Sequence, residues 1–386
     1  MRLYSRFFAI ATIGTIALLP LLLLPAMVGV LVDDGGLTET QAGWLSAVGA
    51  LGGAGVSFMM ALRMHCIQPR RLAAIMLLLA TGLDGISAFI VGPDAAFYGV
   101  RILSGLATTA AYVIVIAAFA RFEQYERGYG MFVTLQFLVS GIGLYLLPVF
   151  SSNMGAKGMY LILAACNAGA FALTAALPST ASAKPQAAEN PMSELRFLLS
   201  LATLAAILGF GIFEMANNVQ FTYVERYGVS IGLVGEEIGF SLLIGSLVGI
   251  PGAFAIVLLG DRFGTVVPLG FGIGMGVLGL VFLSLGPSYS GYFIGSCCLG
   301  FSWAFCLPFI QSLLAGLDRE GSVLAAGSTA SMLGAAIGPG LAAAVLGEGN
   351  YRAVFAVAIF LFVLSFAAFL VSRTRASAAA KTMVTT

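Results

Sequence analysis

Long apolar runs dominate the sequence and restrict what it can fold into. Each run is about twenty residues long, and short polar or Gly/Pro clusters separate it from the next. A membrane-spanning helix needs about 20 mostly apolar residues, whereas a barrel strand has a shorter, alternating pattern. Of the 386 residues, 60% are hydrophobic and 9% are charged, and ordinary soluble domains have about 25% charged residues. We therefore expect an all-α polytopic membrane protein without a soluble domain.

The runs predict twelve membrane-spanning helices. Their expected bounds are 8–32, 42–62, 72–92, 95–119, 129–150, 157–177, 197–223, 236–259, 266–286, 289–315, 322–346 and 352–372. The first run has no small-residue cleavage site, so we interpret it as a retained helix rather than a signal peptide. Pro20 and Pro25 predict kinks within it.

The distribution of Lys and Arg predicts the orientation of these helices. With the N-terminus in the cytoplasm, fourteen Lys and Arg residues fall on the cytoplasmic side and three, Lys157, Arg226 and Arg352, fall outside. An excess of basic residues in cytoplasmic loops is the signal that sets topology. We therefore expect both termini in the cytoplasm.

A polar connection rich in Pro, Ala and Ser divides the runs into six and six. Such a composition cannot bury enough apolar surface to fold by itself. The predicted organisation is an N-terminal six-helix bundle (1–178), a cytoplasmic linker (179–195) and a C-terminal six-helix bundle (196–386). Short basic connections after the second and eighth runs, ALRMHCIQPRR and LLGDRFG, indicate a weak internal repeat, as is common in secondary transporters.

The motif LLGDRFG resembles a loop of the major facilitator superfamily, which joins the second and third helices of each half. The resemblance covers essentially the whole chain and implies a conformational gating role for the basic connections. In the first half, Cys66 stands where the family usually has an aspartate. The gating residues that the resemblance implies are Asp261, Arg262, Gly264, Arg70 and Arg71.

The fourth run strengthens this resemblance. Its sequence YGVRILSGLATTAAY is similar to the family's Arg-then-Gly motif, with Arg101 and Gly105 at the expected spacing. The family's Gly-Pro antiporter motif is missing from the fifth run, SGIGLYLLP. The resemblance implies the superfamily fold, with twelve helices in two pseudo-symmetric six-helix halves that rock around a central site. It also implies that helices 1, 4, 7 and 10 line the central cavity.

Three charged residues are expected within the spans: Asp84, Arg101 and Glu214. A charge at the bilayer centre costs about 2.5 to 3.5 kcal/mol on insertion scales, so it persists where it is paired or meets water. Asp84 and Arg101 flank a tight hairpin, each roughly 9 to 12 Å from its outer end, so one interpretation is a structural ion pair. The other is a substrate-binding Arg101, because Thr108 and Tyr112 continue a polar stripe along its helix.

Glu214 is the strongest candidate for proton coupling. Asn217 and Asn218 follow it at i+3 and i+4, so a carboxylate and two amides share one helix face. An intramembrane carboxylate of this kind can take up and release a proton during transport. The alternative is a neutral acid hydrogen-bonded to another helix. Asp84 is the second candidate for proton coupling.

The candidate substrate-binding residues are polar or aromatic side chains within the runs. They are Arg101, Tyr112, Gln136, Asn217, Asn218, Trp303 and Gln311. For Gln136, Trp303 and Gln311, the alternative is an interhelical hydrogen bond, which is the more common role of such residues.

The sequence does not support enzyme chemistry, metal binding or nucleic-acid binding. His65 is the only histidine, and the five cysteines have neither a paired framework nor metal-ligand spacing. The alternating glycines at 270–276 do not follow a strand and lack the Lys-Ser/Thr of a nucleotide loop, so they indicate close helix packing. A net charge of +1 gives no electrostatic case for nucleic acid. We expect no cofactor and no enzymatic activity.

These observations predict a proton-linked secondary transporter of a small organic solute. Uptake of an organic anion by proton symport is favoured, because Arg101 is the single intramembrane cation and the antiporter motif is missing. The alternative is a proton-coupled efflux antiporter for lipophilic or cationic compounds, with Glu214 as the cation partner. An embedded enzyme would need a catalytic constellation, and a receptor an appended domain.

The expected partners are a small-molecule substrate, protons and the lipid bilayer, and we expect a monomer. Short loops and the absence of an Asn-x-Ser/Thr site favour a bacterial inner membrane.

Overall fold

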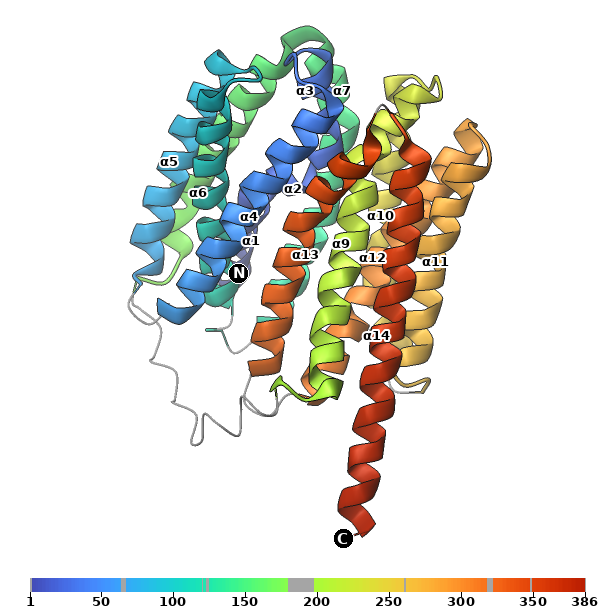
Figure 1. Cartoon of the computed structure of the whole chain (residues 1–386). Coiled ribbons are helices and arrows are strands. Elements are labelled where there is room, and N and C mark those ends of the chain that lie inside the picture. The colour runs from blue at the N-terminus through green and yellow to red at the C-terminus, as the bar shows by residue number, and fades with distance from the viewer. Residues whose placement is uncertain are drawn as a thin grey trace. The chain divides into compact units, whose positions relative to one another are not determined.

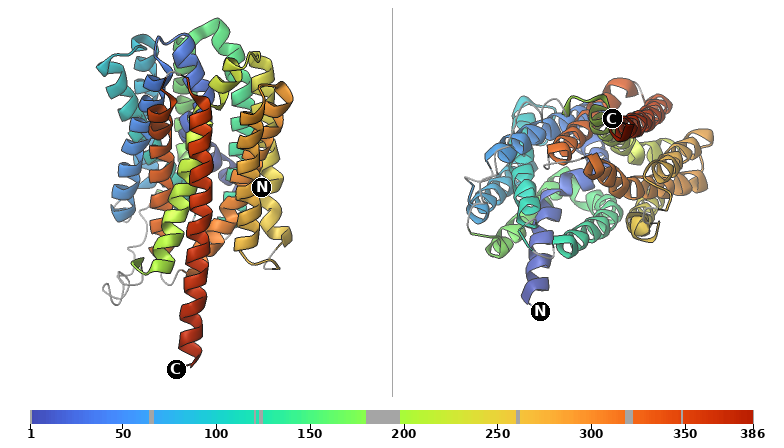
Figure 2. Two further views of the ribbon diagram at one scale, coloured as in Figure 1. Left: turned by 45° about the vertical axis from the view of Figure 1, so that its right-hand side comes forward. Right: turned by 90° about the horizontal axis from the view of Figure 1, so that it is seen from below.

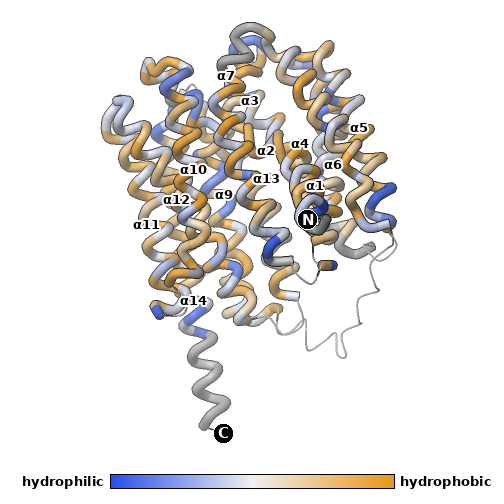
Figure 3. The backbone as a smooth tube through the Cα atoms, turned by 180° about the vertical axis from the view of Figure 1, so that it is seen from behind, coloured by the Kyte–Doolittle hydropathy of each residue, from blue (hydrophilic) through white to orange (hydrophobic). Residues whose placement is uncertain are grey.

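The computed structural model describes residues 2–63, 67–119, 121–122, 125–179, 198–259, 262–317, 322–347 and 349–385. Every regular element among these residues is a helix (Figure 1). Apolar residues predominate along most helices, with isolated polar positions between them (Figure 3). The predicted all-α architecture is confirmed.

The helices follow the predicted runs in order. Those before the linker are α1 (Arg2–Ala17), α2 (Leu19–Leu22), α3 (Leu24–Asp33), α4 (Glu39–Arg63), α5 (Pro69–Ile90), α6 (Ala95–Phe119), α7 (Tyr125–Ala172) and the 3₁₀ turn η2 (Leu173–Ala176). Those after it are α9 (Leu201–Ser230), α10 (Gly235–Leu259), α11 (Val266–Leu285), α12 (Tyr289–Leu317), α13 (Ser322–Leu346) and α14 (Tyr351–Thr385).

Among the described residues, ten helical segments are long and apolar enough to cross a membrane. Helix α7 supplies two of them, Arg127–Leu147 and Met154–Ala176. The two remaining predicted spans coincide with α4 and with the interrupted segment α1 to α3. Each of the twelve predicted spans therefore has a helical counterpart.

The first predicted span is broken twice, where its two prolines lie. Pro20 and Pro25 each occupy the first turn of a restarted helix, α2 and α3. A proline is tolerated there because its missing N–H would have no helical partner. The predicted kinks are confirmed.

Helix α7 is interrupted at Gly155, which has φ 60° and ψ −166°. The carboxylate of Asp34 accepts a hydrogen bond from the backbone N–H of Ala156 at 2.6 Å. An acidic side chain in this position caps the helix that restarts. The glycine provides the left-handed backbone conformation that turns the chain between the two spans.

The chain forms two compact units. The first contains Met1–Pro185 and Phe221–Leu243, and the second contains Gln186–Gln220 and Ile244–Thr386. Helices α9 and α10 thus each contribute to both units. The predicted boundaries of the two six-helix bundles, 1–178 and 196–386, stay a prediction.

Side chains pack between the helices of each unit, and Figure 2 shows these helices from two further sides. In the first, Phe7, Phe119 and Phe132 lie in an apolar cluster contributed by α1, α4, α5, α6 and α7. In the second, α11 and α12 approach closely where Gly279 and Gly295 face each other's backbone. Gly272 and Gly276 also face α12 and Gly270 faces Phe366 on α14, so close packing accounts for three of the four glycines of the predicted ladder.

Candidate functional site

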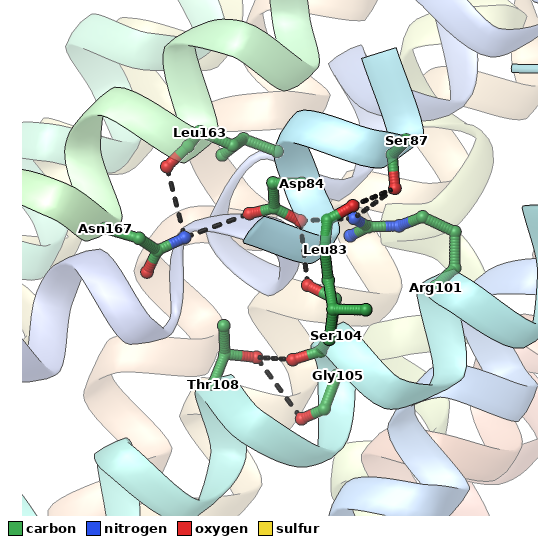
Figure 4. Close-up of polar contacts among 9 residues, drawn as sticks. All are labelled: Leu83, Asp84, Ser87, Arg101, Ser104, Gly105, Thr108, Leu163 and Asn167. Atoms are coloured by element: carbon green, nitrogen blue, oxygen red, sulfur yellow. Dashed lines mark hydrogen bonds and ion pairs between the residues drawn. The ribbon is translucent and has the colours of Figure 1, made fainter. Parts of the chain in front are cut away.

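A buried carboxylate is the centre of a polar cluster in the first unit. Asp84 on α5 is fully buried. Its Oδ1 accepts hydrogen bonds from Nη1 of Arg101 at 2.5 Å and from Oγ of Ser104 at 2.7 Å, both on α6. Its Oδ2 accepts from Nδ2 of Asn167 on α7 at 2.9 Å (Figure 4). Three helices thus meet at one ion pair, and the predicted pairing of Asp84 with Arg101 is confirmed.

The guanidinium of Arg101 is enclosed on its other sides as well. It donates to Oγ of Ser87 at 3.4 Å and lies 4.7 Å from the ring centre of Tyr160. Only 8% of the residue is exposed. The local sequence explains this arrangement, because Ser87 follows Asp84 by one helical turn and Ser104 follows Arg101 by one turn. The charge of Arg101 is therefore balanced where it lies, and its substrate-binding role stays a prediction.

The rest of the polar stripe on α6 has local partners. The hydroxyl of Thr108 donates to the carbonyl of Ser104 at 3.0 Å. The ring of Tyr112 lies 6.2 Å from that of Phe132, at the edge of the apolar cluster. The described contacts of Thr108 and Tyr112 are thus with residues of the first unit.

Glu214 on α9 is the corresponding buried carboxylate of the second unit, with 6% of the residue exposed. The indole N–H of Trp303 on α12 lies 3.2 Å from its Oε1 and 3.4 Å from its Oε2. None of the ion pairs between described residues involves Glu214. Glu214 and Trp303, predicted separately, therefore form one site, and the described partner of the carboxylate is neutral.

The two asparagines beside Glu214 donate to the backbone of their own helix. Nδ2 of Asn217 donates to the carbonyl of Phe213, and Nδ2 of Asn218 donates to the carbonyl of Glu214, both at 2.9 Å. These are bonds to the backbone one turn earlier, a local competitor that short polar side chains commonly find. Both asparagines are buried.

Gln136 on α7 and Gln311 on α12 are half-buried. No hydrogen bond within the described ranges joins either glutamine to Asp84 or Glu214. Their predicted contact with substrate stays a prediction.

The predicted gating residues occupy different environments. Arg70 donates to the carbonyls of Ala175 at 2.7 Å and Leu177 at 3.2 Å, so it caps the end of η2. Gly264 has φ +61°, and the guanidinium of Arg373 lies over it. Arg71 and Arg262 are exposed. Asp261, like Cys66 and His65, lies outside the described residues.

The structure reveals a charged cluster that the sequence analysis missed. Helix α9 continues to Ser230, past the predicted end at residue 223, and this candidate span includes Glu225 and Arg226. Both residues are buried, with 6% and 5% exposed. Arg226 was counted among the residues outside the membrane, and neither Glu225 nor Arg226 was selected as a site residue. The available signal was an adjacent acid and base directly after the apolar run, in FTYVERYG.

Arg226 forms the centre of this cluster. Its Nη1 and Nη2 donate to the two carboxylate oxygens of Asp33, at 2.6 and 2.8 Å. Its Nε and Nη2 donate to Glu225, at 2.8 and 3.0 Å. No metal-ligating group of three His, Cys, Asp or Glu residues occurs in the part of the chain that was described.

Comparisons with known proteins agree with this architecture. A family model described as Major Facilitator Superfamily matches residues 6–325. No curated protein matches the chain. Among solved structures, a mutant of the nucleoside transporter NupG aligns with a TM-score of 0.77 and 11% identity, over 95% of this chain and 99% of that one.

A second solved structure is a bacterial homolog of the human lysosomal transporter Spinster, in an inward-facing and unoccupied conformation. It aligns with a TM-score of 0.71 and 13% identity, over 96% of this chain and 97% of that one. At these identities the likenesses establish the shared fold.

Proposed function

The chain belongs to the major facilitator superfamily and is a multi-pass membrane transporter, not an enzyme, and we propose that it is a proton-linked secondary transporter of a small organic solute. Transport proceeds by alternating access, and the protein resides in a bacterial inner membrane with both termini in the cytoplasm. Protons bind at Glu214, and the solute binds near Glu214 and Trp303.

The environment of Glu214 is the observation that carries this proposal. Its carboxylate is buried within a candidate span, and its described hydrogen-bond donor is the neutral indole of Trp303. An indole N–H can donate to a carboxylate and also to the carbonyl oxygen of the protonated acid. The contact with Trp303 therefore persists in both protonation states, while binding of a proton removes the buried charge. Such a site suits reversible proton binding.

The ion pair of Arg101 bears on the charge of the solute. Organic-anion uptake was favoured because Arg101 is a cation within a span, but its charge is already balanced by Asp84. Glu214, in contrast, has no described cationic partner. This observation favours the second candidate function, proton-coupled efflux of lipophilic or cationic compounds, in which solute and proton compete for Glu214. Anion uptake would require Arg101 to leave Asp84.

The experiment begins with the substrate. A thermal-shift screen of purified protein against carboxylates, sugars, amino acids and cationic drugs identifies ligands, because a ligand that binds the folded state raises its stability. Reconstituted protein is then assayed for accumulation of that ligand under an imposed pH gradient. Release of bound protons on adding a cationic ligand indicates antiport, whereas proton uptake with an anionic ligand indicates symport.

Glu214→Gln tests the coupling group. Glutamine resembles the protonated acid, so the variant should fold but lose accumulation driven by the pH gradient. Under symport it should still bind the solute and exchange it across the membrane, whereas under antiport it should also lose binding of the cationic solute. Glu236→Gln, the same change at an exposed glutamate, is the matched control and should behave as wild type. If Glu214→Gln protein concentrates solute with the wild-type pH dependence, Glu214 is a structural acid.

A further inference from the structure

The cluster of Asp33, Glu225 and Arg226, called the latch below, lies entirely within the first unit. Asp33 is the last residue of α3, and Glu225 and Arg226 lie near the end of α9. The Asp33 and Arg226 positions are separated by 193 residues. The latch thus attaches the end of α9 to the end of the first predicted span.

Two carboxylates share one guanidinium in the latch, each through a different edge. Asp33 accepts from the two terminal nitrogens, and Glu225 accepts from Nε and one terminal nitrogen. Bidentate contacts of this kind are the strongest hydrogen bonds that arginine forms. One carboxylate is enough to balance the charge of Arg226.

The two carboxylates differ in how they are connected to Arg226. Glu225 is its neighbour in the chain and moves with it, and the Glu225 side chain is 9% exposed. Asp33 belongs to another helix, and its side chain is 64% exposed. A separation of α9 from α3 would therefore break the contacts to Asp33 and leave those to Glu225. Arg226 would keep a counter-ion, which avoids the large cost of a buried unpaired charge.

Further non-covalent contacts hold the segment Phe221–Leu243 against helices of the first unit. Gly29 on α3 leaves room for the Glu225 carboxylate, which would collide with any side chain at that position. The hydroxyl of Tyr223 donates to the carbonyl of Glu39 at 2.7 Å. Gly239 on α10 lies against Tyr145 on α7. The rest of α9 and α10 belongs to the second unit.

We propose that the latch holds Phe221–Leu243 against the first-half helices in one state of the transport cycle, and that its Asp33 half is released in another. Glu225 remains on Arg226 as its counter-ion in both states. Glu225 is then a positioning residue whose function is to permit release. This inference concerns the conformational cycle and does not depend on Glu214 as the proton site, since its readout requires neither solute nor a pH gradient.

The test measures the distance between two spin labels in the full-length protein. In a variant without the native cysteines, labels are placed through Ala96→Cys and Val234→Cys, at exposed positions of the first unit. Asp33→Asn keeps the shape of an exposed side chain but removes its charge, so folding should be unaffected. We expect the distance distribution to shift from the short population towards a longer one. Asp34→Asn, the same change at the adjacent residue, should leave the distribution unchanged.

Glu225→Gln should produce the opposite shift. Without Glu225, Asp33 is the remaining anionic partner of Arg226, so release would leave a buried unpaired guanidinium. The population with the longer distance between the labels should disappear, and the population with the shorter distance should increase. A merely structural role for Glu225 would loosen the segment and lengthen the distances. Thermal unfolding and size-exclusion profiles accompany both variants.

Two results would overturn the proposal. An unchanged distribution for Asp33→Asn would show that the ion pair does not hold the segment. A lengthening for Glu225→Gln would show that Glu225 belongs to the latch as a second holding group, which contradicts its assigned role in release. Loss of pH-driven accumulation in Glu214→Gln, with the distances unchanged, would leave the latch supported and separate the two questions.

Discussion

At the level of single residues, Asp84 shows how a charged side chain is accommodated within the helices of the first unit. Its two oxygens accept from Arg101, Ser104 and Asn167, and these donors come from two other helices. A buried ion pair is tolerated when additional hydrogen bonds satisfy its remaining lone pairs. The cluster therefore joins α5, α6 and α7 and also balances the charge of Arg101.

We predict strong coupling between Asp84 and Arg101. Asp84→Asn or Arg101→Gln alone should lower the free energy of unfolding by about 3 to 5 kcal/mol, because each leaves a buried unpaired charge. The double variant should recover much of this loss. Thermal or denaturant unfolding in detergent measures the effect, with Ser104→Ala as a control that removes one hydrogen bond. Additive losses in the double variant would show that the two charges do not depend on each other.

At the level of helices, the break in α7 depends on one glycine and one cap. Gly155 has a positive φ, and a Cβ at this position would meet the Asp34 carboxylate that caps Ala156. A side chain there would be strained and would collide with the cap. Two consecutive aspartates thus have separate functions, since Asp34 restarts a helix and Asp33 binds Arg226.

Gly155→Ala should lower stability by about 1 to 3 kcal/mol, the usual cost of a residue held in an unfavourable backbone conformation. Gly130→Ala in the same helix should raise stability by up to about 1 kcal/mol, because Gly130 has a helical backbone and open space around it. The melting temperatures of the two variants in the same detergent test this opposite response. Equal responses would mean that the break in α7 is not set by Gly155.

For the whole molecule, the twelve-helix topology orders the predicted loops into two ends. In the first unit, Arg6 and Arg70 both donate to carbonyls in 175–177, which brings the starts of α1 and α5 to the end of η2. Asp34 joins the end of α3 to the turn at Gly155. The contacts of Arg6 and Arg70 join connections that are predicted to be cytoplasmic. The contact of Asp34 joins connections that are predicted to be outside.

Cysteine labelling in intact cells tests this topology. In a variant lacking the native cysteines, Lys157→Cys should react with an impermeant maleimide from outside, because it lies at the predicted outer end of the sixth span and is exposed. Lys184→Cys, in the predicted linker, should react only after the cells are opened. Detergent-solubilised protein, in which both positions should label, is the control. Labelling of position 184 from outside would contradict the model of two six-helix halves.

The sequence by itself determined the positions of the helices. A backbone within the bilayer must satisfy its hydrogen bonds internally, so each apolar run of sufficient length becomes a helix whatever its neighbours are. This is why the predicted spans have helical counterparts, and why Asp84 and Arg101, on two helices joined by a short turn, were correctly expected to meet.

The tertiary structure decided which distant side chains meet. Asn167 reaches Asp84 across 83 residues, Trp303 reaches Glu214 across 89, and Arg226 reaches Asp33 across 193. Residue type and spacing identify polar side chains in apolar runs, but the face that each helix presents depends on how the helices pack. For this reason the sequence revealed Glu214 as a buried acid, whereas the latch became visible only in the folded chain.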